Sequence, residues 1–383
     1  MGKKGVMTSD VYEKLAKHLD DLPSGYPRTK NGAEMRILRR LFTPEEAELA
    51  VDISLIEETA EVIARRARIP VKEAARILEN MEKKGLIYVH HRKSKPPRYQ
   101  ASGYVIGFFE FQVNKLNPEL IKDVEEYTPH WFDKGAWKKV PQLRTIPVNE
   151  SIQVKNEVLP YEHAEQLIQD EEIFAVAPCI CRQEQKIQGH GCDRPLETCL
   201  VFGRAAEYYI HNNLGRKIDR EEVRKILKTA NKTGLVLQPS NAKEPSNICT
   251  CCGCCCGVLR NIKRHPRPAT LVWSPCIAEL DTDVCNGCGI CVSRCQMDAL
   301  SLDNEYAVLN SERCIGCGLC ISTCPTHALR LVRKPKSEQR HIPKNIVRTN
   351  IKLGRVRGKL SLGKMLQMVL KSVIDRIVAT KRD

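Results

Sequence analysis

The chain opens with apolar residues at helical spacing. Val11, Leu15 and Leu19 share one helix face, which predicts a short N-terminal helix within residues 1–20. Residues 21–102 continue with three more stretches of helical periodicity and then two short strand-like stretches around a basic loop. The pattern therefore predicts three helices followed by a β-hairpin across residues 21–102.

The periodicity changes after this segment. Residues 103–178 show no dominant period and are expected to form a mixed α/β connector, and residues 200–228 read as helix with a break at Gly215. Residues 333–359 are basic, hold few core residues and are expected to be extended or disordered. From Leu360 onward apolar residues recur at helical spacing among Lys and Arg, which predicts an amphipathic basic helix.

Charge separates the C-terminal tail from the rest of the chain. The 383 residues carry a formal net charge of +15. Residues 333–383 hold fifteen Lys and Arg against three Asp and Glu, and fifteen minus three gives +12 of that total. We expect this tail to dock on a partner or on the body of the protein, or to contact an anionic membrane surface.

Cysteine content points to metal chemistry. Neither an apolar signal core nor a run of about 18 apolar residues is present, so we expect a cytoplasmic protein, with peripheral contact at the cytoplasmic membrane face as an alternative. In a reducing compartment, clustered cysteines are metal ligands or redox centres. Nineteen cysteines in such a chain therefore predict metal sites.

Two cysteine runs with the same spacing lie 29 residues apart. Cys285, Cys288, Cys291 and Cys295 form C-x2-C-x2-C-x3-C, and Cys314, Cys317, Cys320 and Cys324 repeat it. The runs resemble those of bacterial two-cluster ferredoxins, in which the fourth cysteine of each run binds the other cluster. The resemblance implies two [4Fe-4S] clusters, one on Cys285, Cys288, Cys291 and Cys324 and the other on Cys314, Cys317, Cys320 and Cys295. Gln296 departs from the pattern because ferredoxins carry proline there.

A second cysteine-rich region lies upstream, within residues 179–278. Its ten clustered cysteines are Cys179, Cys181, Cys192, Cys199, Cys249, Cys251, Cys252, Cys254, Cys255 and Cys256. Spacing suggests two registers in the dense stretch, one of Cys249, Cys252 and Cys255 and one of Cys251, Cys254 and Cys256. One or two further iron–sulfur clusters are expected, with a zinc site on Cys179, Cys181, Cys192 and Cys199, or a thiol–disulfide or persulfide site within 249–256, as alternatives. This arrangement resembles uncharacterised iron–sulfur proteins of anaerobic bacteria and archaea, in which a similar region precedes a two-cluster ferredoxin.

The order of elements in residues 21–102 resembles a winged helix-turn-helix domain. The resemblance implies a helix at 71–84 that enters a DNA groove and a basic wing at 90–97. The outward residues of that helix carry three cations and three anions, whereas phosphate binding requires a net positive face. DNA binding is therefore disfavoured.

Together these patterns predict an α+β multidomain chain. We expect an N-terminal helix (1–20), a winged-helix-like domain (21–102), a connector (103–178), a cysteine-rich cluster domain (179–278), a two-[4Fe-4S] ferredoxin domain (279–332) and a basic tail (333–383). No nucleotide-binding motif occurs, so the redox partner is expected on another protein. The predicted function is electron transfer through [4Fe-4S] clusters, alone or as an oxidoreductase subunit. The alternatives are a redox-sensing DNA-binding regulator and a reductase whose substrate binds a cluster within 179–256.

Overall fold

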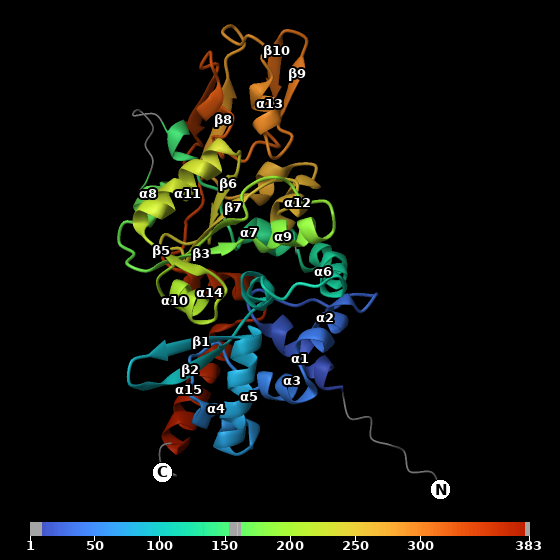
Figure 1. Cartoon of the computed structure of the whole chain (residues 1–383), viewed down its shortest axis with the longest axis vertical. Coiled ribbons are helices and arrows are strands. Elements are labelled where there is room, and N and C mark those ends of the chain that lie inside the picture. The colour runs from blue at the N-terminus through green and yellow to red at the C-terminus, as the bar shows by residue number, and fades with distance from the viewer. Residues whose placement is uncertain (1–9, 133, 153–158, 160–161, 380–383) are drawn as a thin grey trace. The chain divides into compact units, whose positions relative to one another are not determined.

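The chain divides into two compact units. The computed structural model describes residues 10–132, 134–152, 159 and 162–379 (Figure 1). Unit 1 comprises Met1–Trp131 and Gly354–Asp383, and unit 2 comprises Phe132–Leu353. The expected connector, 103–178, is shared between the two units.

Helices and one hairpin build unit 1. They are α1 (Val11–Asp21), α2 (Ala33–Leu41), α3 (Pro44–Ala50), α4 (Ala60–Ala67), α5 (Val71–Lys84), β1 (Ile87–Arg92), β2 (Lys95–Ala101), the short helical turns η1 (Tyr104–Phe108) and η2 (Glu110–Gln112), α6 (Pro118–Trp131) and α15 (Leu362–Ala379). Thr43 caps α3 in a capping box with Glu46, and Gly85 ends α5 with a φ of +73°. Helices do precede a hairpin as expected, but there are four of them (α2 to α5) where three were expected. Membership of the winged-helix family stays a prediction.

An aromatic cluster explains why the segment after the hairpin belongs to unit 1. The ring of Tyr26 lies 4.8 Å from that of Tyr127 in α6 and 5.6 Å from that of Tyr104 in η1. Phe108 packs beside them, and all four side chains are buried. Such ring pairs add about 0.5–1.5 kcal/mol each beyond area burial. The cluster holds η1 and α6 to the segment between α1 and α2.

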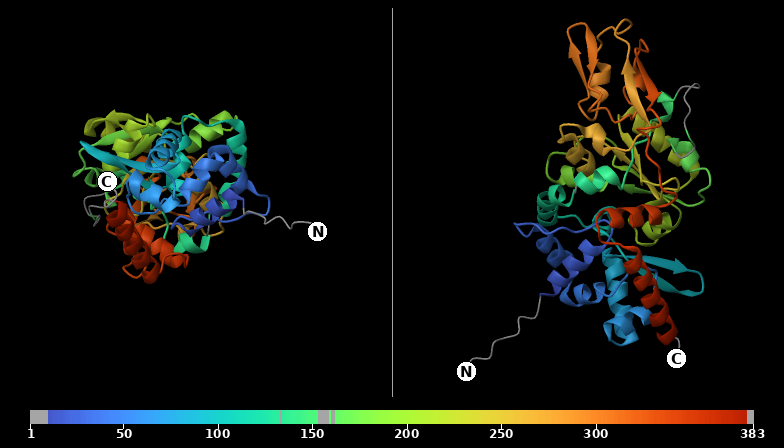
Figure 2. Two further views of the ribbon diagram at one scale, coloured as in Figure 1. Left: turned by 90° about the horizontal axis from the view of Figure 1, so that it is seen from below. Right: turned by 180° about the vertical axis from the view of Figure 1, so that it is seen from behind.

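The expectation for 333–359 is wrong at residues 346–356, which are helical, while residues 334–344 form coil and turns without helix or strand. Helix α14 (Ile346–Val356) forms because Thr349 and Leu353 are buried, and the Thr349 hydroxyl donates to the Asn241 carbonyl at 2.5 Å. Helix α15 is the predicted C-terminal helix and lies beside α4 (Figure 2). Every helix in the described residues is too short or too polar to reach across a bilayer.

Unit 2 is built around a five-stranded antiparallel sheet with strand order β5-β3-β4-β7-β6. Its strands are β3 (Phe174–Pro178), β4 (Glu197–Phe202), β5 (Arg216–Ile218), β6 (Val236–Pro239) and β7 (Asn247–Cys251), and the helices between or after them are α9 (Ile180–Ile187), α10 (Gly203–His211), α11 (Arg220–Lys232) and α12 (Gly257–Lys263). The sequence expectation of a helix over 200–228 broken at Gly215 is right for α10 and α11, which lie on either side of the break, and wrong at two short segments. The first residues of this range pair as β4 with β3, and the segment after Gly215 pairs as β5 before α11 begins. Short helices α7 (Lys134–Lys139) and α8 (Ala164–Leu167) and the turns η3 (Asn149–Ser151) and η5 (Pro268–Leu271) complete this part.

The two ferredoxin-like cysteine runs lie in a smaller part of unit 2. Strand β8 (Cys276–Leu280) pairs with β11 (Leu329–Arg333), and β9 (Leu300–Asp303) pairs with β10 (Tyr306–Leu309), both antiparallel. Helix α13 (Ile290–Arg294) contains Cys291, the third cysteine of the first run, and the turn η6 (Ile321–Thr323) follows Cys320, the third of the second run. The first and last strands of the segment thus close it into one small body.

Candidate metal centres

Cysteines from both ferredoxin-like runs line one pocket. Cys285, Cys288 and Cys291 of the first run and Cys324 of the second all border it, together with backbone and apolar side chains. This is the crossed set that the ferredoxin resemblance implies. The Ala307 N–H donates to Cys285 Sγ at 3.4 Å, and such amide–sulfur hydrogen bonds tune cluster potential. The donor set and its enclosure therefore fit a [4Fe-4S] cluster, while ligation itself stays a prediction.

The crossed partner set is more deeply buried. Cys314 and Cys320 are buried, and Cys295 and Cys317 are half-buried. Burial, reinforced by the neighbouring Cys295 and Cys314, raises the pKa of the Cys317 thiol to about 12. The Ala299 N–H donates to Cys295 Sγ at 3.2 Å. A metal bound here would displace thiol protons, because coordinating thiols are deprotonated.

Glycine is required in the second of these loops. Gly316 has a φ of +65°, and a Cβ there would overlap the carbonyl oxygen of Cys276. Gly318, with a φ of +76°, would meet the Ser151 hydroxyl in the same way. Any larger residue would push the loop away from its neighbours, so these glycines fix where the flanking cysteines point.

Four upstream cysteines form a compact group, which we call the quartet. The Sγ atoms of Cys192, Cys252, Cys254 and Cys255 all lie within 4.8 Å of one another. Three of them belong to the turn between β7 and α12, and Cys192 comes from the loop before β4. Four thiols at this separation suit one tetrahedral metal ion, because ligand sulfurs at about 2.3 Å from a metal lie about 3.8 Å apart. A [4Fe-4S] cluster would need the four thiols to spread to roughly 6 Å.

Arg194 supplies positive charge to the quartet. Its Nη1 donates to Cys254 Sγ at 3.5 Å, and its Nε donates to the Thr233 carbonyl at 3.0 Å. Burial alone would raise the pKa of Cys192, but hydrogen bonds from Arg194 outweigh it and lower that pKa to about 7. A thiolate is thus available at this corner near neutral pH, which favours metal binding.

The other six of the ten clustered cysteines form a second group, which we call the row. Neighbouring thiols hydrogen-bond along it in the spatial order Cys179, Cys181, Cys256, Cys251, Cys249 and Cys199. Strand pairing explains part of it, because the β4–β7 register sets Cys199 opposite Cys249, and alternate residues of β7 share one face. Hydrogen bonds from Cys181 and Cys251 lower the pKa of Cys256. Six thiols exceed the needs of one tetrahedral ion, so the row suits a larger or shared centre.

Arg182 interacts with both groups. Its side chain is 3% exposed, donates to the Thr250 carbonyl at 2.9 Å and also bonds the Thr198 hydroxyl. Burial opposes its charge, but the neighbouring Cys179 of the row and Cys252 of the quartet raise the pKa of Arg182. A permanent buried cation here stabilises negative charge on either group.

Gln296 joins the quartet to the ferredoxin-like segment. The side-chain oxygen of Gln296 accepts from the Gly253 N–H at 2.8 Å, and its amide donates to the Arg294 carbonyl at 3.2 Å. A Cβ at Gly253 would overlap the Gln296 carbonyl oxygen. Gly253 lies between Cys252 and Cys254, and Gln296 follows Cys295. The residue that departs from the ferredoxin pattern therefore holds two cysteine sites against each other.

The grouping corrects two expectations for the upstream region. The suggested registers, Cys249 with Cys252 and Cys255 and Cys251 with Cys254 and Cys256, are wrong, because β7 turns Cys249 and Cys251 the same way and the turn at 253–255 gathers the others. The zinc set of Cys179, Cys181, Cys192 and Cys199 is divided between the row and the quartet. Sequence reasoning also missed Gln296 as a link, although its departure from proline was a usable signal.

Comparison with known proteins identifies one segment. Residues 278–331 match the family model of a 4Fe-4S dicluster domain. No curated protein and no solved structure matches the chain. The match covers both cysteine runs, strands β9 and β10 and parts of β8 and β11. Residues 278–331 of this chain therefore form a 4Fe-4S dicluster domain, a module that supports iron–sulfur electron transfer.

Proposed function

We propose that the chain relays single electrons between its dicluster domain and a metal centre on the quartet, as a subunit of an oxidoreductase system. The main support for this proposal is the pocket lined by Cys285, Cys288, Cys291 and Cys324. It brings together cysteines of both runs in the crossed set that two-cluster ferredoxins use. When bound, [4Fe-4S] clusters supply reversible one-electron storage. The chain contributes thiolates, amide–sulfur hydrogen bonds and burial, which together set the potential.

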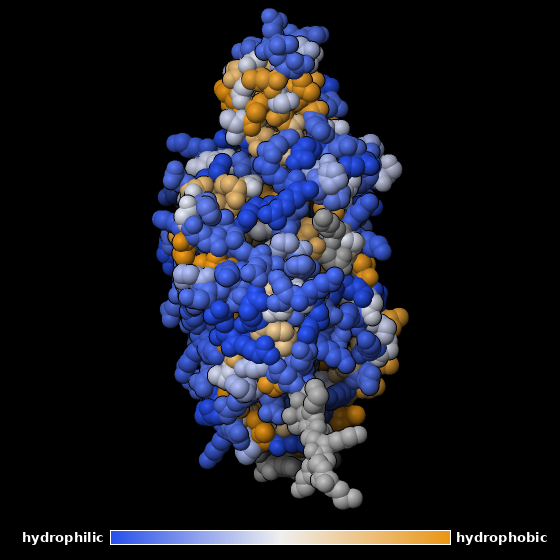
Figure 3. Space-filling view, turned by 90° about the vertical axis from the view of Figure 1, so that its right-hand side faces the viewer, coloured by the Kyte–Doolittle hydropathy of each residue, from blue (hydrophilic) through white to orange (hydrophobic). Residues whose placement is uncertain are grey.

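The outer side of the dicluster domain is suited to a redox partner. Cys288 is exposed, and Val284, Ile290 and Leu302 around this part are 49%, 40% and 47% exposed. Figure 3 shows hydrophobic residues gathered near the top of the view, which is the end at which Figure 1 labels the elements of the dicluster domain. Exposed apolar patches of this kind mark protein interaction sites. A docked partner would exclude water around the pocket and exchange electrons there.

The inner side faces the quartet. Gly253, which contacts Gln296, is the chain neighbour of two quartet cysteines, and Gln296 is the chain neighbour of Cys295 in the dicluster domain. This short connection supports an electron path from the dicluster domain into the cysteine-rich region. Cys179, Cys181, Cys199 and Cys249 of the row are half-buried and therefore partly accessible, which supports a second candidate function, reduction of a substrate bound at the row.

DNA binding has less support. On α5, Lys83 pairs with Glu79 at 2.6 Å, and Arg76 pairs with Glu45 of α3. These pairs neutralise the face that would meet phosphate groups. Phosphate-driven binding needs unpaired cations, so these pairs weigh against the regulator alternative.

Metal content tests the proposal. The full chain is purified anaerobically, and iron, acid-labile sulfide and zinc per chain are measured for the native protein and for Cys254→Ser and Cys276→Ser. The dicluster domain accounts for about eight iron atoms, and a cluster on the quartet raises the count to about twelve. Cys254→Ser should lose the additional iron, whereas Cys276→Ser, at a buried cysteine outside the proposed ligand sets, should leave the count unchanged.

Electron paramagnetic resonance of the reduced proteins supplies the functional readout. A quartet cluster in the path should be reduced through the dicluster domain and show spin coupling to it. Zinc on the quartet with about eight iron atoms would overturn the relay while leaving the dicluster domain intact.

A further inference from the structure

Helix α15 presents its apolar side to solvent. Leu362, Leu366, Val369, Leu370, Val373 and Ile374 are between 45% and 71% exposed. At 3.6 residues per turn they cover an arc of about 140° and a length of about 18 Å along the helix. A surface helix normally turns such a face inward, so this one is inverted.

Polar residues hold the opposite side of α15 to unit 1. Ser372 and Asp375 are its buried side chains, and Asp375 pairs with the buried Arg66 of α4 at 3.1 Å. The helix is therefore already folded and anchored without its apolar arc. Binding through the arc needs no coupled folding, which would otherwise reduce affinity.

Exposed charge on α15 is positive. Lys364 and Lys371 are exposed, while the single acidic side chain of the described helix, Asp375, is buried against Arg66. A second copy of the helix would bring like charges together with no anions to pair them, which disfavours self-association. An anionic surface is complementary.

The shape and chemistry of the arc favour lipid over a protein groove. A helix bound in a protein groove makes contact through a narrow stripe of side chains on one face. The side chains that contribute most binding energy at the centre of protein interfaces are typically Trp, Tyr or Arg. The arc is wide, and all six of its residues are aliphatic. A helix lying in a membrane interface buries such a face and keeps its lysines at the headgroups. We propose that α15 is a docking surface for an anionic lipid bilayer.

Vesicle sedimentation of the full chain tests this proposal. The probes are vesicles of phosphatidylcholine alone and vesicles of equal parts phosphatidylcholine and phosphatidylglycerol. The native chain should bind the anionic vesicles more tightly, and added salt should weaken that binding. Leu366→Gln with Leu370→Gln should lower the partition coefficient about tenfold or more per leucine.

The lysines give a separate readout. The Lys364→Gln, Lys371→Gln variant should have a partition coefficient on anionic vesicles that is lower by about fivefold per lysine, and its binding to phosphatidylcholine vesicles should be unchanged. Val71→Gln with Lys72→Gln, on the exposed start of α5, is the matched control and should bind as the native chain does. Circular dichroism checks that each variant is folded.

Two results would overturn the inference. One is equal binding of the native chain and the leucine variant to anionic vesicles. The other is a native dimer in analytical ultracentrifugation that the leucine variant dissociates, since the arc would then be covered by a second copy. Neither result bears on iron content, so failure here is distinguishable from failure of the relay.

Discussion

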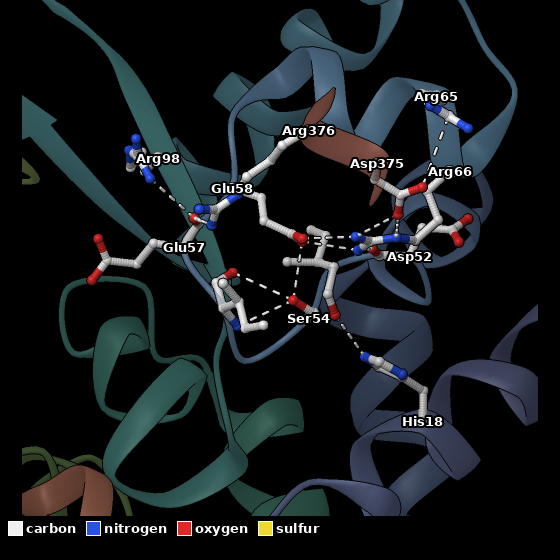
Figure 4. A network of polar contacts seen from close by, with 12 residues as sticks. His18, Asp52, Ser54, Glu57, Glu58, Arg65, Arg66, Arg98, Asp375 and Arg376 are labelled. Atoms are coloured by element: carbon white, nitrogen blue, oxygen red, sulfur yellow. Dashed lines mark hydrogen bonds and ion pairs between the residues drawn. The ribbon is translucent and has the colours of Figure 1, made fainter. Parts of the chain in front are cut away.

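Arg66 is predicted to be the residue that fastens α15 to unit 1. Its five guanidinium N–H groups are all engaged: two with Glu58 at 2.7 and 2.9 Å, two with Asp375 at 3.1 Å and one with the Asp52 carbonyl at 2.6 Å (Figure 4). The Arg66 side chain is 8% exposed and that of Glu58 is fully buried. Arg66→Met keeps an unbranched stem and removes the charge.

The expected cost follows from what the substitution leaves behind. Glu58 would remain buried without its cation, and within the described residues Asp375 would keep only the longer contact to Arg65 at 3.8 Å. Removing one partner of a buried ion pair costs about 3–5 kcal/mol. The equilibrium constant for opening of α15 should therefore rise about 10²- to 10⁴-fold.

Hydrogen–deuterium exchange of peptides from α4 and α15 measures that opening directly. Arg65→Met is the matched control, because Arg65 reaches the same Asp375 only at 3.8 Å and its side chain is 34% exposed. Arg65→Met should lower the free energy of opening of α15 by under about 1 kcal/mol, so the exchange rate should rise by less than about fivefold. If Arg66→Met exchanged no faster than Arg65→Met in α15, the buried network would not be what holds the helix.

Three further expectations concern pH and close packing. Burial alone would raise the pKa of Glu58, but the bonds from Arg66 and Ser372 hold it below its ordinary value of 4.5. The stability that this lowered pKa adds is complete above pH 4.5 and is lost as pH falls through the lowered pKa. Hydrogen–deuterium exchange in α15, corrected for intrinsic rates, should therefore rise on acidification of the native chain and should change less in Arg66→Met. Gly253→Ala should push the quartet turn off Gln296 and lower metal bound by the quartet, while Gly363→Ala, which meets nothing closer than 3.9 Å, should not; equal metal content in both would contradict the close contact. Gly316→Ala should displace the loop against Cys276 and remove about four iron atoms per chain, measured by iron assay, and an unchanged count would show that the loop can shift without losing its ligands.

Local signals carried most of the prediction for unit 1. The Thr43-Pro44 start of α3 and the Gly85 stop of α5 are signals of this kind, because caps depend on neighbouring residues alone. Within 200–228 only the strand segments of β4 and β5 were missed, because helical spacing in a short apolar run does not exclude a strand, and pairing with β3 decided the outcome.

The cysteine sites divide in the same way. Regular spacing within each ferredoxin-like run sufficed to predict the dicluster domain, which the family comparison confirms. The upstream grouping depends on strand faces and on a turn, and Cys192 joins Cys252, Cys254 and Cys255 across about sixty residues of sequence. Such long-range proximity is set by the fold of unit 2 and is invisible in local spacing.

Chain order gives the ion pair of Arg66 a consequence for biosynthesis. Unit 2 is inserted between the two segments of unit 1, and Asp375 follows Arg66 by 309 residues. At about 5–20 residues per second, a ribosome needs about 15 to 60 s to make that stretch. During this interval Glu58 and Arg66 have been synthesised but Asp375 has not. Unit 1 thus obtains its last helix only after every cysteine of the chain has been translated.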